Sequence, residues 1–227
     1  MTWLIRPEDP VDYQTAAAAM HELADRRARD DVPDTLVLLE HPPVYTAGTR
    51  ARADHVLWGH DRMEAEGASF HEVDRGGSVT FHGPGQLVGY PVVDLGRRPD
   101  LAAYLSRLEE VIIRAGRDYG IRLGRDPIQA GVWAGEAKVC AIGIRLMRWR
   151  ITLHGFGLNC DPDLSWFDAI VPCGLADRSV TSLSQLAGRR ISVAETAPAV
   201  MAHYAEVFDT GFEDAPAPIA ETFRGAA

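Results

Sequence analysis

Two stretches rich in β-branched and aromatic residues, separated by a long helical stripe, constrain this 227-residue chain more than any other feature. The stretches run over residues 69–95 and 131–159, and the stripe of apolar residues at helical spacing between them covers 101–119. Because the strands come in clusters and do not alternate one by one with helices, the sequence predicts an α+β fold. We expect mixed or antiparallel sheets flanked by helices.

Further elements frame these two blocks. The patterns predict an N-terminal helix starting at Asp9 and Pro10, a buried strand, a short helix and a capped final helix, over residues 11–29, 35–39, 56–66 and 192–208. The residues after 210 are small, polar and interrupted by proline, so we predict a flexible tail over 211–227. Because nothing resembling a linker divides the rest, we interpret residues 1–210 as a single domain.

Composition narrows the class of protein. Hydrophobic residues make up 46% of the chain and charged residues 24%, which is the mix of an ordinary globular protein. The longest apolar runs fall far short of the roughly 20 residues that span a bilayer, and no leader-like segment opens the chain, so we expect a cytoplasmic protein. The net charge of −9 argues against nucleic acid and membrane as partners.

Three cysteines are an odd number, and none lies at the short spacing of paired metal ligands, so we expect neither a disulfide framework nor a metal site. Cys173 stands between Pro172 and Gly174, a setting that would hold its thiol on a rigid, exposed turn. Cys140 and Cys160 lie inside apolar strands and are expected to be inert. Cys173 is the candidate nucleophile, although a lone cysteine in a loop is more often structural, and both interpretations stay open.

Lys138 is the only lysine, because the 23 basic residues comprise 22 arginines and one lysine. Arginine supplies a permanent charge, whereas the amine of a lysine can lose its proton. Lys138 is therefore a candidate acid/base residue. A lysine left by chance on a solvated strand explains the count equally well, so the count by itself decides nothing.

The segment 74–86, DRGGSVTFHGPGQ, combines many glycines with one arginine, one histidine and one glutamine. Glycine lets the backbone approach a ligand closely, but tight turns around a core histidine at His82 explain the segment equally well. Neither GxGxxG nor GxxxxGK[ST] is present, so nucleotide binding has little support. Lys138, His82 and His154 all fall in the β-rich blocks and are candidate partners of Cys173.

Seven short runs occur in a fixed order along the chain. They are PVYTAG at 43–48, RGGSVTFHGPGQ at 75–86, GVW at 131–133, KVCAIG at 138–143, HGFGLN at 154–159, PCG at 172–174 and VTSL at 180–183. In this order they resemble the octanoyltransferases, also called lipoate-protein ligase B. The resemblance covers about residues 42–183, with compatible helices on either side.

This resemblance implies the α+β catalytic domain shared with biotin ligases and ATP-dependent lipoate ligases. Family members move an octanoyl group from acyl carrier protein to a lysine of a lipoyl domain, through a cysteine thioester assisted by a lysine. That reaction is the first step of protein lipoylation from endogenous octanoate, and it needs no cofactor. The implied partners are octanoyl-acyl carrier protein and the lipoyl domains of 2-oxoacid dehydrogenase complexes and of the glycine cleavage H protein.

Matching motifs also imply roles for single residues. Cys173 corresponds to the acyl-accepting nucleophile and Lys138 to the acid/base residue. The acyl site would be lined by Arg75, Gly76, Gly77, Ser78, His82, Gly83, Ala141, Ile142, Gly143, His154, Gly155 and Gly157. The chain departs from the family at Val73, Gly157 and Cys160, where serine, alanine and valine are common, and these departures bear on the width of the pocket.

Two other functions remain as alternatives: a non-catalytic module that binds acyl groups or lipoyl domains, and a Cys–His thioesterase. Because acyl carrier proteins are acidic, we also predict a local basic docking patch formed by Arg145, Arg148 and Arg150. Simple solvation of these three arginines is the alternative interpretation.

Overall fold

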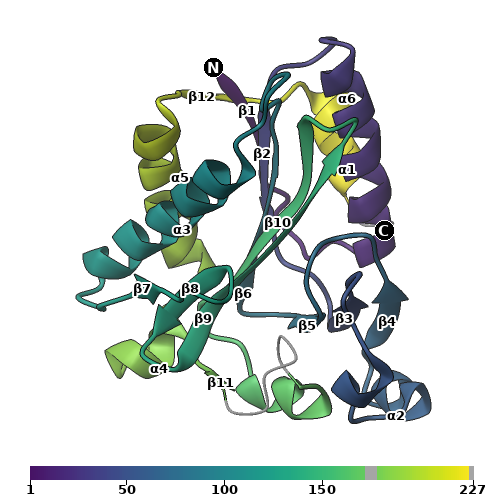
Figure 1. Ribbon diagram of the computed structural model, residues 1–227, viewed down its shortest axis with the longest axis vertical. Coiled ribbons are helices and arrows are strands. Elements are labelled where there is room, and N and C mark those ends of the chain that lie inside the picture. The colour runs from purple at the N-terminus through teal and green to yellow at the C-terminus, as the bar shows by residue number, and fades with distance from the viewer. Residues whose placement is uncertain (172–177, 225–227) are drawn as a thin grey trace.

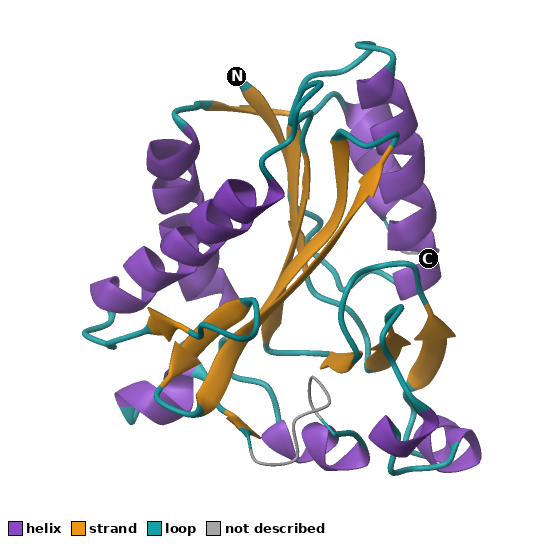
Figure 2. Ribbon diagram, viewed as in Figure 1, coloured by secondary structure: helices purple, strands orange, loops and turns teal. Residues whose placement is uncertain are grey.

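The computed structural model describes residues 1–171 and 178–224. In this part of the chain a large sheet passes through the molecule with helices on both faces, and a smaller sheet stands beside it (Figure 1 and Figure 2). The helices are α1 (Tyr13–Ala28), α2 (His60–Ala65), α3 (Leu101–Asp118), α4 (Leu183–Ala187), α5 (Val193–Phe208) and α6 (Ala217–Ala220). Short 3₁₀ turns occupy η1 (Ala53–His55), η2 (Leu164–Ala169) and η4 (Glu221–Phe223).

The large sheet has the strand order β12-β1-β2-β6-β10-β9-β8-β7 in the described part of the chain, with β11 joined to β9. β1 runs parallel to β12 and β2, whereas the pairs from β2 to β7 are antiparallel. The strands are β1 (Thr2–Ile5), β2 (Thr35–Leu39), β6 (Gln86–Val92), β7 (Gly124–Arg125), β8 (Gly131–Ala134), β9 (Ala137–Met147), β10 (Ile151–Asn159), β11 (Ser179–Val180) and β12 (Phe212–Asp214).

Each face of this sheet buries its own hydrophobic core. In Figure 1, α3 and α5 cover one face, while α1 and α6 cover the other. Side chains alternate along β2, so Leu36 and Leu38 join the core under α3 and α5, and Val37 and Leu39 join the core under α1. The clustered strands and the long central helix predicted from the sequence are present, and the α+β class is confirmed.

The small sheet has the order β4-β3-β5, with β4 (Ser69–Glu72) parallel and β5 (Val79–His82) antiparallel to β3 (Val44–Ala47). An aromatic core lies beneath it, in which the ring of Phe81 stacks on Trp166 with centroids 5.3 Å apart. The segment between β4 and β5 therefore starts and ends on one rigid sheet, and its backbone reaches β9, where the Gly76 N–H donates to the carbonyl of Ile144 (3.2 Å).

Two helix starts differ from the sequence prediction. Asp12, not Asp9, caps α1, because its carboxylate accepts a hydrogen bond from the Thr15 N–H at 3.0 Å. The helix predicted over 56–66 is shorter, since Val56 instead pairs with Ile170 in a β-bridge and α2 begins at His60. The predicted cap of α5 is present, with the Ser192 hydroxyl accepting from the backbone N–H of residue 195 at 3.2 Å.

The C-terminal segment differs most from the prediction of a flexible tail. Residues 212–214 form β12, which pairs in parallel with β1, and α6 and η4 follow. Phe223 is fully buried in the core under α1, and Ile219 lies beside it. The predicted tail is thus wrong for 211–224, because a distant strand supplies the pairing partner that local composition does not reveal; residues 225–227 lie outside the described residues. Among the described residues no helix is both long and apolar enough to cross a membrane.

Candidate functional site

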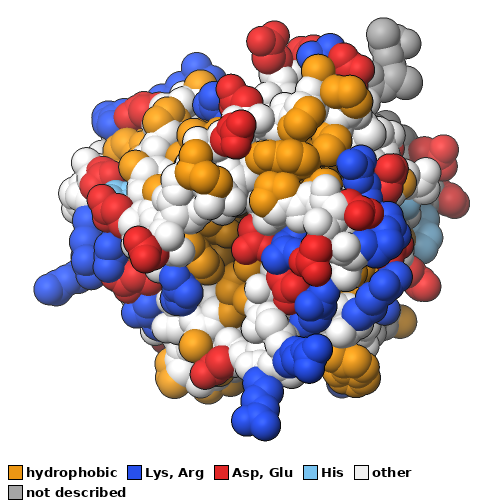
Figure 3. Space-filling model, turned by 90° about the horizontal axis from the view of Figure 1, so that it is seen from above, with side chains coloured by type: hydrophobic (Ala, Val, Ile, Leu, Met, Phe, Trp, Pro, Cys, Tyr) orange, Lys and Arg blue, Asp and Glu red, His pale blue; other side chains and the backbone are white. Residues whose placement is uncertain are grey.

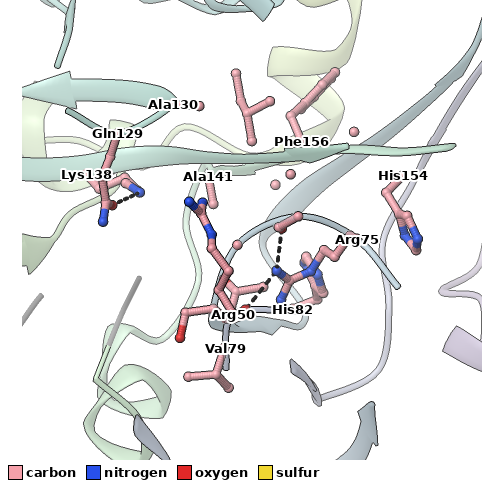
Figure 4. Close-up of a pocket in the computed structure, with 18 of the residues that line it drawn as sticks. Arg50, Arg75, Val79, His82, Gln129, Ala130, Lys138, Ala141, His154 and Phe156 are labelled. Carbon is pink, nitrogen blue, oxygen red and sulfur yellow. Dashed lines mark hydrogen bonds between the residues drawn. The ribbon is translucent and has the colours of Figure 1, made fainter. Parts of the chain in front are cut away.

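A cavity of about 460 Å³ lies where the β9–β10 hairpin faces the segment between β4 and β5. Figure 4 shows Lys138 and Gln129 at one end of this cavity, Arg75 and His82 in the middle, and His154 at the other end. Its size falls in the range of small-molecule sites. Three of the sequence motifs, at 75–86, 138–143 and 154–159, which are far apart along the chain, therefore meet around one cavity.

Most residues that the sequence singled out line this cavity. They are Lys138, Arg75, Gly76, Gly77, Ser78, His82, Ala141, Ile142, Gly143, His154, Gly155 and Gly157. Gly83 does not line the cavity; it follows His82 in the turn between β5 and β6, and a Cβ there would meet the ring of Phe81 at 2.4 Å. The predicted nucleophile, Cys173, lies outside the described residues.

Sequence reasoning did not single out several other lining residues. Tyr13 comes from the start of α1, Gln129 from the turn before β8, and Arg50 and Arg52 from the loop after β3. None of them belongs to a glycine-rich or otherwise unusual motif. Only their position in the fold identifies them.

Lys138 is buried at the cavity wall, with 5% of the residue exposed. Its Nζ donates to the amide oxygen of Gln129 at 3.3 Å and lies 4.5 Å from the ring centroid of Trp133. Gly131 makes room for this arrangement: its φ is +130°, and a Cβ there would lie 2.6 Å from the carbonyl oxygen of Cys140. The only lysine is thus a buried cavity residue, and the solvated strand face considered above is excluded.

Arg75 braces the loop that forms the cavity floor. One terminal nitrogen of its guanidinium donates to the Thr46 carbonyl (2.6 Å) and the other to the Ser78 carbonyl (2.8 Å). The loop can turn tightly because Gly77 has a φ of +97°, and Gly48 is needed because a Cβ there would lie 2.6 Å from the Gly77 carbonyl oxygen. Arg75 therefore lines the cavity and also holds the loop at its floor in place.

His154 adopts a left-handed backbone with a φ of +60° in the middle of β10. Such a conformation is uncommon for a residue with a side chain and is enriched at functional sites. The ring Nε2 lies 2.7 Å from the carboxylate of Asp74, which also pairs with Arg145. Burial lowers the pKa of His154 to about 3, and the charges of Arg75, His21 and Arg145 lower it as well.

The two described cysteines are fully buried. Desolvation raises the pKa of Cys160 to about 12 and that of Cys140 further still. Both thiols therefore stay protonated near neutral pH, and neither lines the cavity. Their burial agrees with the inert packing role expected from the sequence.

The three arginines predicted to form a docking patch are each paired with a carboxylate. Arg145 pairs with Asp74, Arg148 with Asp25 (2.9 Å) and Arg150 with Asp94 (3.0 Å). The face seen in Figure 3 likewise carries basic and acidic side chains next to one another and no field of one sign. These arginines are therefore largely neutralised, and the structure gives no support to a patch of free positive charge at this position.

The cavity itself has a positive lining. Arg50, Arg75 and Lys138 line it together with Arg52, which pairs with Asp54 at 2.8 Å, and the described lining residues include no carboxylate, although the chain as a whole is acidic. In Figure 4 the Arg50 side chain extends into the cavity toward Ala141. In the described ranges, no three His, Cys, Asp or Glu side chains group in a way that could hold a metal ion.

Comparison with known proteins bears directly on this site. Residues 12–205 match the family described as the lipoyl protein ligase A/B catalytic domain. The chain belongs to this family. An octanoyltransferase from Acidothermus cellulolyticus is 47% identical over 201 residues, covering 86% of this chain and 87% of the relative. One from Gloeobacter violaceus is 49% identical over 200 residues, covering 87% and 86%. The chain is accordingly a transferase that moves octanoyl groups in protein lipoylation.

Solved structures confirm the fold. A lipoate-protein ligase A bound with ATP matches with a TM-score of 0.76 at 17% identity, covering 98% of this chain and 92% of that one. A bipartite lipoate protein ligase from Thermoplasma acidophilum, studied with its E2 lipoyl domain, has a TM-score of 0.75 at 15% identity, with 98% and 89% covered. Biotin protein ligase from Aquifex aeolicus, in complex with biotin and ATP, has a TM-score of 0.57 at 14% identity, with 91% and 70% covered.

Proposed function

We propose that the chain takes its octanoyl group from a thioester on acyl carrier protein, holds it on Cys173, and passes it to a lysine of a lipoyl domain. Lys138 acts as the acid in the first step and as the base in the second. The observation that carries this proposal is the position of Lys138, the only lysine, buried at the wall of a cavity in a member of an octanoyltransferase family. We take residues 1–224 to act as one catalytic domain in the cytoplasm.

In the first half-reaction the Cys173 thiolate attacks the thioester carbonyl. The bond from carbon to the pantetheine sulfur breaks, the leaving thiolate takes a proton from the Lys138 ammonium, and the acyl group stays on Cys173. The amide oxygen of Gln129 accepts a hydrogen bond from the Lys138 Nζ, and the face of the Trp133 ring lies 4.5 Å from it.

In the second half-reaction the amine of the acceptor lysine attacks the acyl-enzyme. The bond from carbon to the Cys173 sulfur breaks, an amide forms, and the attacking nitrogen gives up its proton to the neutral amine of Lys138. In the proposed sequence the first step leaves Lys138 neutral, which is the form that the second step uses, and the second step restores its ammonium.

The acyl chain would lie in the cavity along Ala141, Ile142 and Phe156, which belong to the apolar part of its described lining. The glycines opposite, at 76 and 77, let backbone come close to the chain. Partners of the proposed reaction are octanoyl-acyl carrier protein and the lipoyl domains of 2-oxoacid dehydrogenase complexes and of the glycine cleavage H protein. One structural neighbour, from Thermoplasma acidophilum, was studied with an E2 lipoyl domain, which agrees with an acceptor of this class.

A transfer assay tests the proposal against its two rivals. Octanoyl-acyl carrier protein is incubated with the enzyme, with and without a lipoyl domain, and acyl-enzyme, free octanoate and octanoylated domain are measured by mass spectrometry. We expect an acyl-enzyme that discharges only when the domain is added. Free octanoate as the main product would establish a thioesterase, and the absence of any acyl-enzyme would establish a binding module.

A further inference from the structure

His82 is a cavity residue whose two ring nitrogens have different surroundings. Its Nδ1 lies 2.7 Å from the amide oxygen of Gln86, while Nε2 has no hydrogen bond within the described part of the chain. The ring lies parallel to that of Tyr13, with an interplanar angle of 7° and the centroids 6.4 Å apart. The hydrogen bond to Gln86 therefore orients the imidazole, and Nε2 is the ring nitrogen that no described residue bonds.

A chain of hydrogen bonds determines which nitrogen of His82 carries the proton. The Asn159 amide nitrogen donates to the carbonyl of Thr181 at 2.9 Å, and a carbonyl can only accept. The Asn159 amide oxygen must then accept from the Gln86 amide nitrogen (2.8 Å), which also donates to the Phe81 carbonyl (3.1 Å). The amide oxygen of Gln86 is left to accept, so His82 Nδ1 must donate.

The other nitrogen of His82 consequently carries a lone pair as long as the ring is neutral. Burial lowers the pKa of His82 to about 3, and His41, Arg75 and His154, which face it, lower it as well. The tyrosines at 13 and 90 complete its surroundings and are uncharged near neutral pH. At physiological pH the cavity therefore presents an imidazole acceptor at Nε2, and no carboxylate accompanies it among the described lining residues.

The same hydrogen-bond chain is anchored beside Lys138. Val180 pairs with Lys138 in the sheet, and the Thr181 N–H donates to the Lys138 carbonyl at 2.9 Å. Gly157 leaves room for the chain, because a Cβ at that position would lie 2.7 Å from the Gln86 amide oxygen and 3.3 Å from His82 Nδ1. The acceptor at His82 and the amine at Lys138 are thus held by one connected framework.

We propose that Nε2 of His82 accepts a hydrogen bond from an N–H group of a substrate, and that Gln86 and Asn159 are positioning residues that keep this nitrogen an acceptor. The inference rests on the proposed function and deepens it. N–H groups occur in both substrates of that reaction, as amides of the pantetheine arm and as the amine of the acceptor lysine. The pantetheine amides take part in acyl-enzyme formation and the acceptor lysine in the transfer step, so rates measured for each half-reaction distinguish the two sources.

The variant His82→Asn separates the role of Nε2 from that of the hydrogen bonds that link His82 to Gln86 and Asn159. An asparagine amide nitrogen can occupy the place of Nδ1 and still donate to Gln86, but nothing replaces Nε2. We expect the melting temperature to stay within a few degrees of the wild type and one half-reaction to slow by about 10- to 100-fold, the loss typical of one unmatched hydrogen bond. Slower acyl-enzyme formation assigns the pantetheine amide, and slower transfer assigns the lysine amine.

Unchanged rates for both half-reactions in a folded His82→Asn protein would overturn the inference. Equal losses in both, together with a lower melting temperature, would overturn it too by assigning His82 a structural role. A wild-type protein that forms no acyl-enzyme refutes the proposed function instead, and the two failures are therefore distinct. His41→Asn is the matched control: both nitrogens of His41 are bonded, to the Val11 carbonyl and the Tyr90 hydroxyl, so stability should fall without a selective effect on either half-reaction.

A second measurement reads the protonation of His82 directly. In the wild type we expect ¹⁵N NMR to show the proton of His82 on Nδ1; a proton on Nε2 would contradict the inference. In Gln86→Glu the new carboxylate should raise the pKa of His82, and the resulting imidazolium carries N–H at both nitrogens. Activity of this variant should then fall as the pH is lowered from 8 to 6 while the wild type stays flat, and parallel profiles would count against the acceptor role.

Discussion

At the residue scale, the two buried cations of the cavity differ in how their donors are used. The guanidinium of Arg75 donates to carbonyl oxygens of Thr46 and Ser78 and holds two loops together. Lys138 donates to a side-chain amide oxygen, that of Gln129. Arginine suits a permanent structural charge and lysine a group that exchanges protons, so the chain has used each residue type where its chemistry fits.

Replacement of Lys138 by arginine tests this distinction. Lys138→Arg keeps the positive charge and much of the side-chain length, but a guanidinium stays protonated at any working pH. We expect a folded protein in which transfer to the lipoyl domain falls by about 10² to 10⁴, the usual share of general acid–base catalysis. Acyl-enzyme formation should suffer less, because a cation is still present. Single-turnover measurement of each half-reaction provides the check, and near-normal transfer would reject the acid/base role.

At the scale of elements, sequence patterns predicted those parts of the fold whose signals are local. The stripe of α3 and the hairpin of β8 and β9 need only their own residues to be recognised. β12 is different: Phe212 pairs with Thr2, more than two hundred positions away, and neither residue's neighbours reveal the pairing. The same holds for the site, since glycine-rich motifs identified His82 but nothing local marked Tyr13 or Gln129 as its neighbours in the cavity.

The C-terminal segment should contribute to stability, contrary to the tail that composition predicts. Phe223 is fully buried against α1, so Phe223→Ala removes a large side chain from a core and leaves a cavity. We expect a loss of about 3–5 kcal/mol and a melting temperature lower by roughly 10 °C. Arg224→Ala, at an exposed neighbouring position, should have little effect. Identical melting curves for both variants would show that the segment does not pack as described.

At the scale of the whole molecule, buried neutral histidines make stability depend on pH. Desolvation lowers the pKa of His41 to about 4 and those of His82 and His154 to about 3, whereas in the unfolded chain all three titrate near 6.5. Below pH 6.5 the unfolded state therefore binds more protons than the folded state, and stability falls as the pH is lowered toward 4. Each group contributes up to about 1.4 kcal/mol per pH unit.

Urea unfolding at a series of pH values between 7.5 and 4.5 measures this effect. We expect the free energy of unfolding to be flat above pH 7 and to decline by about 3–4 kcal/mol per pH unit between 6 and 4.5. His82→Asn removes one of these three groups and should reduce that slope by about a third. A wild-type slope that matches the variant's would mean that His82 is not held neutral in the fold.

The central claim of the proposed reaction is that Cys173 carries the acyl group, and intact mass spectrometry tests it most directly. The protein is incubated with octanoyl-acyl carrier protein, without acceptor, and its mass is read before and after hydroxylamine treatment. The claim predicts one hydroxylamine-sensitive octanoyl group in the wild type and in a Cys140→Ser, Cys160→Ser protein, whose replaced thiols are buried and protonated. It predicts none in Cys173→Ser, and a hydroxylamine-sensitive octanoyl group on that variant would contradict it.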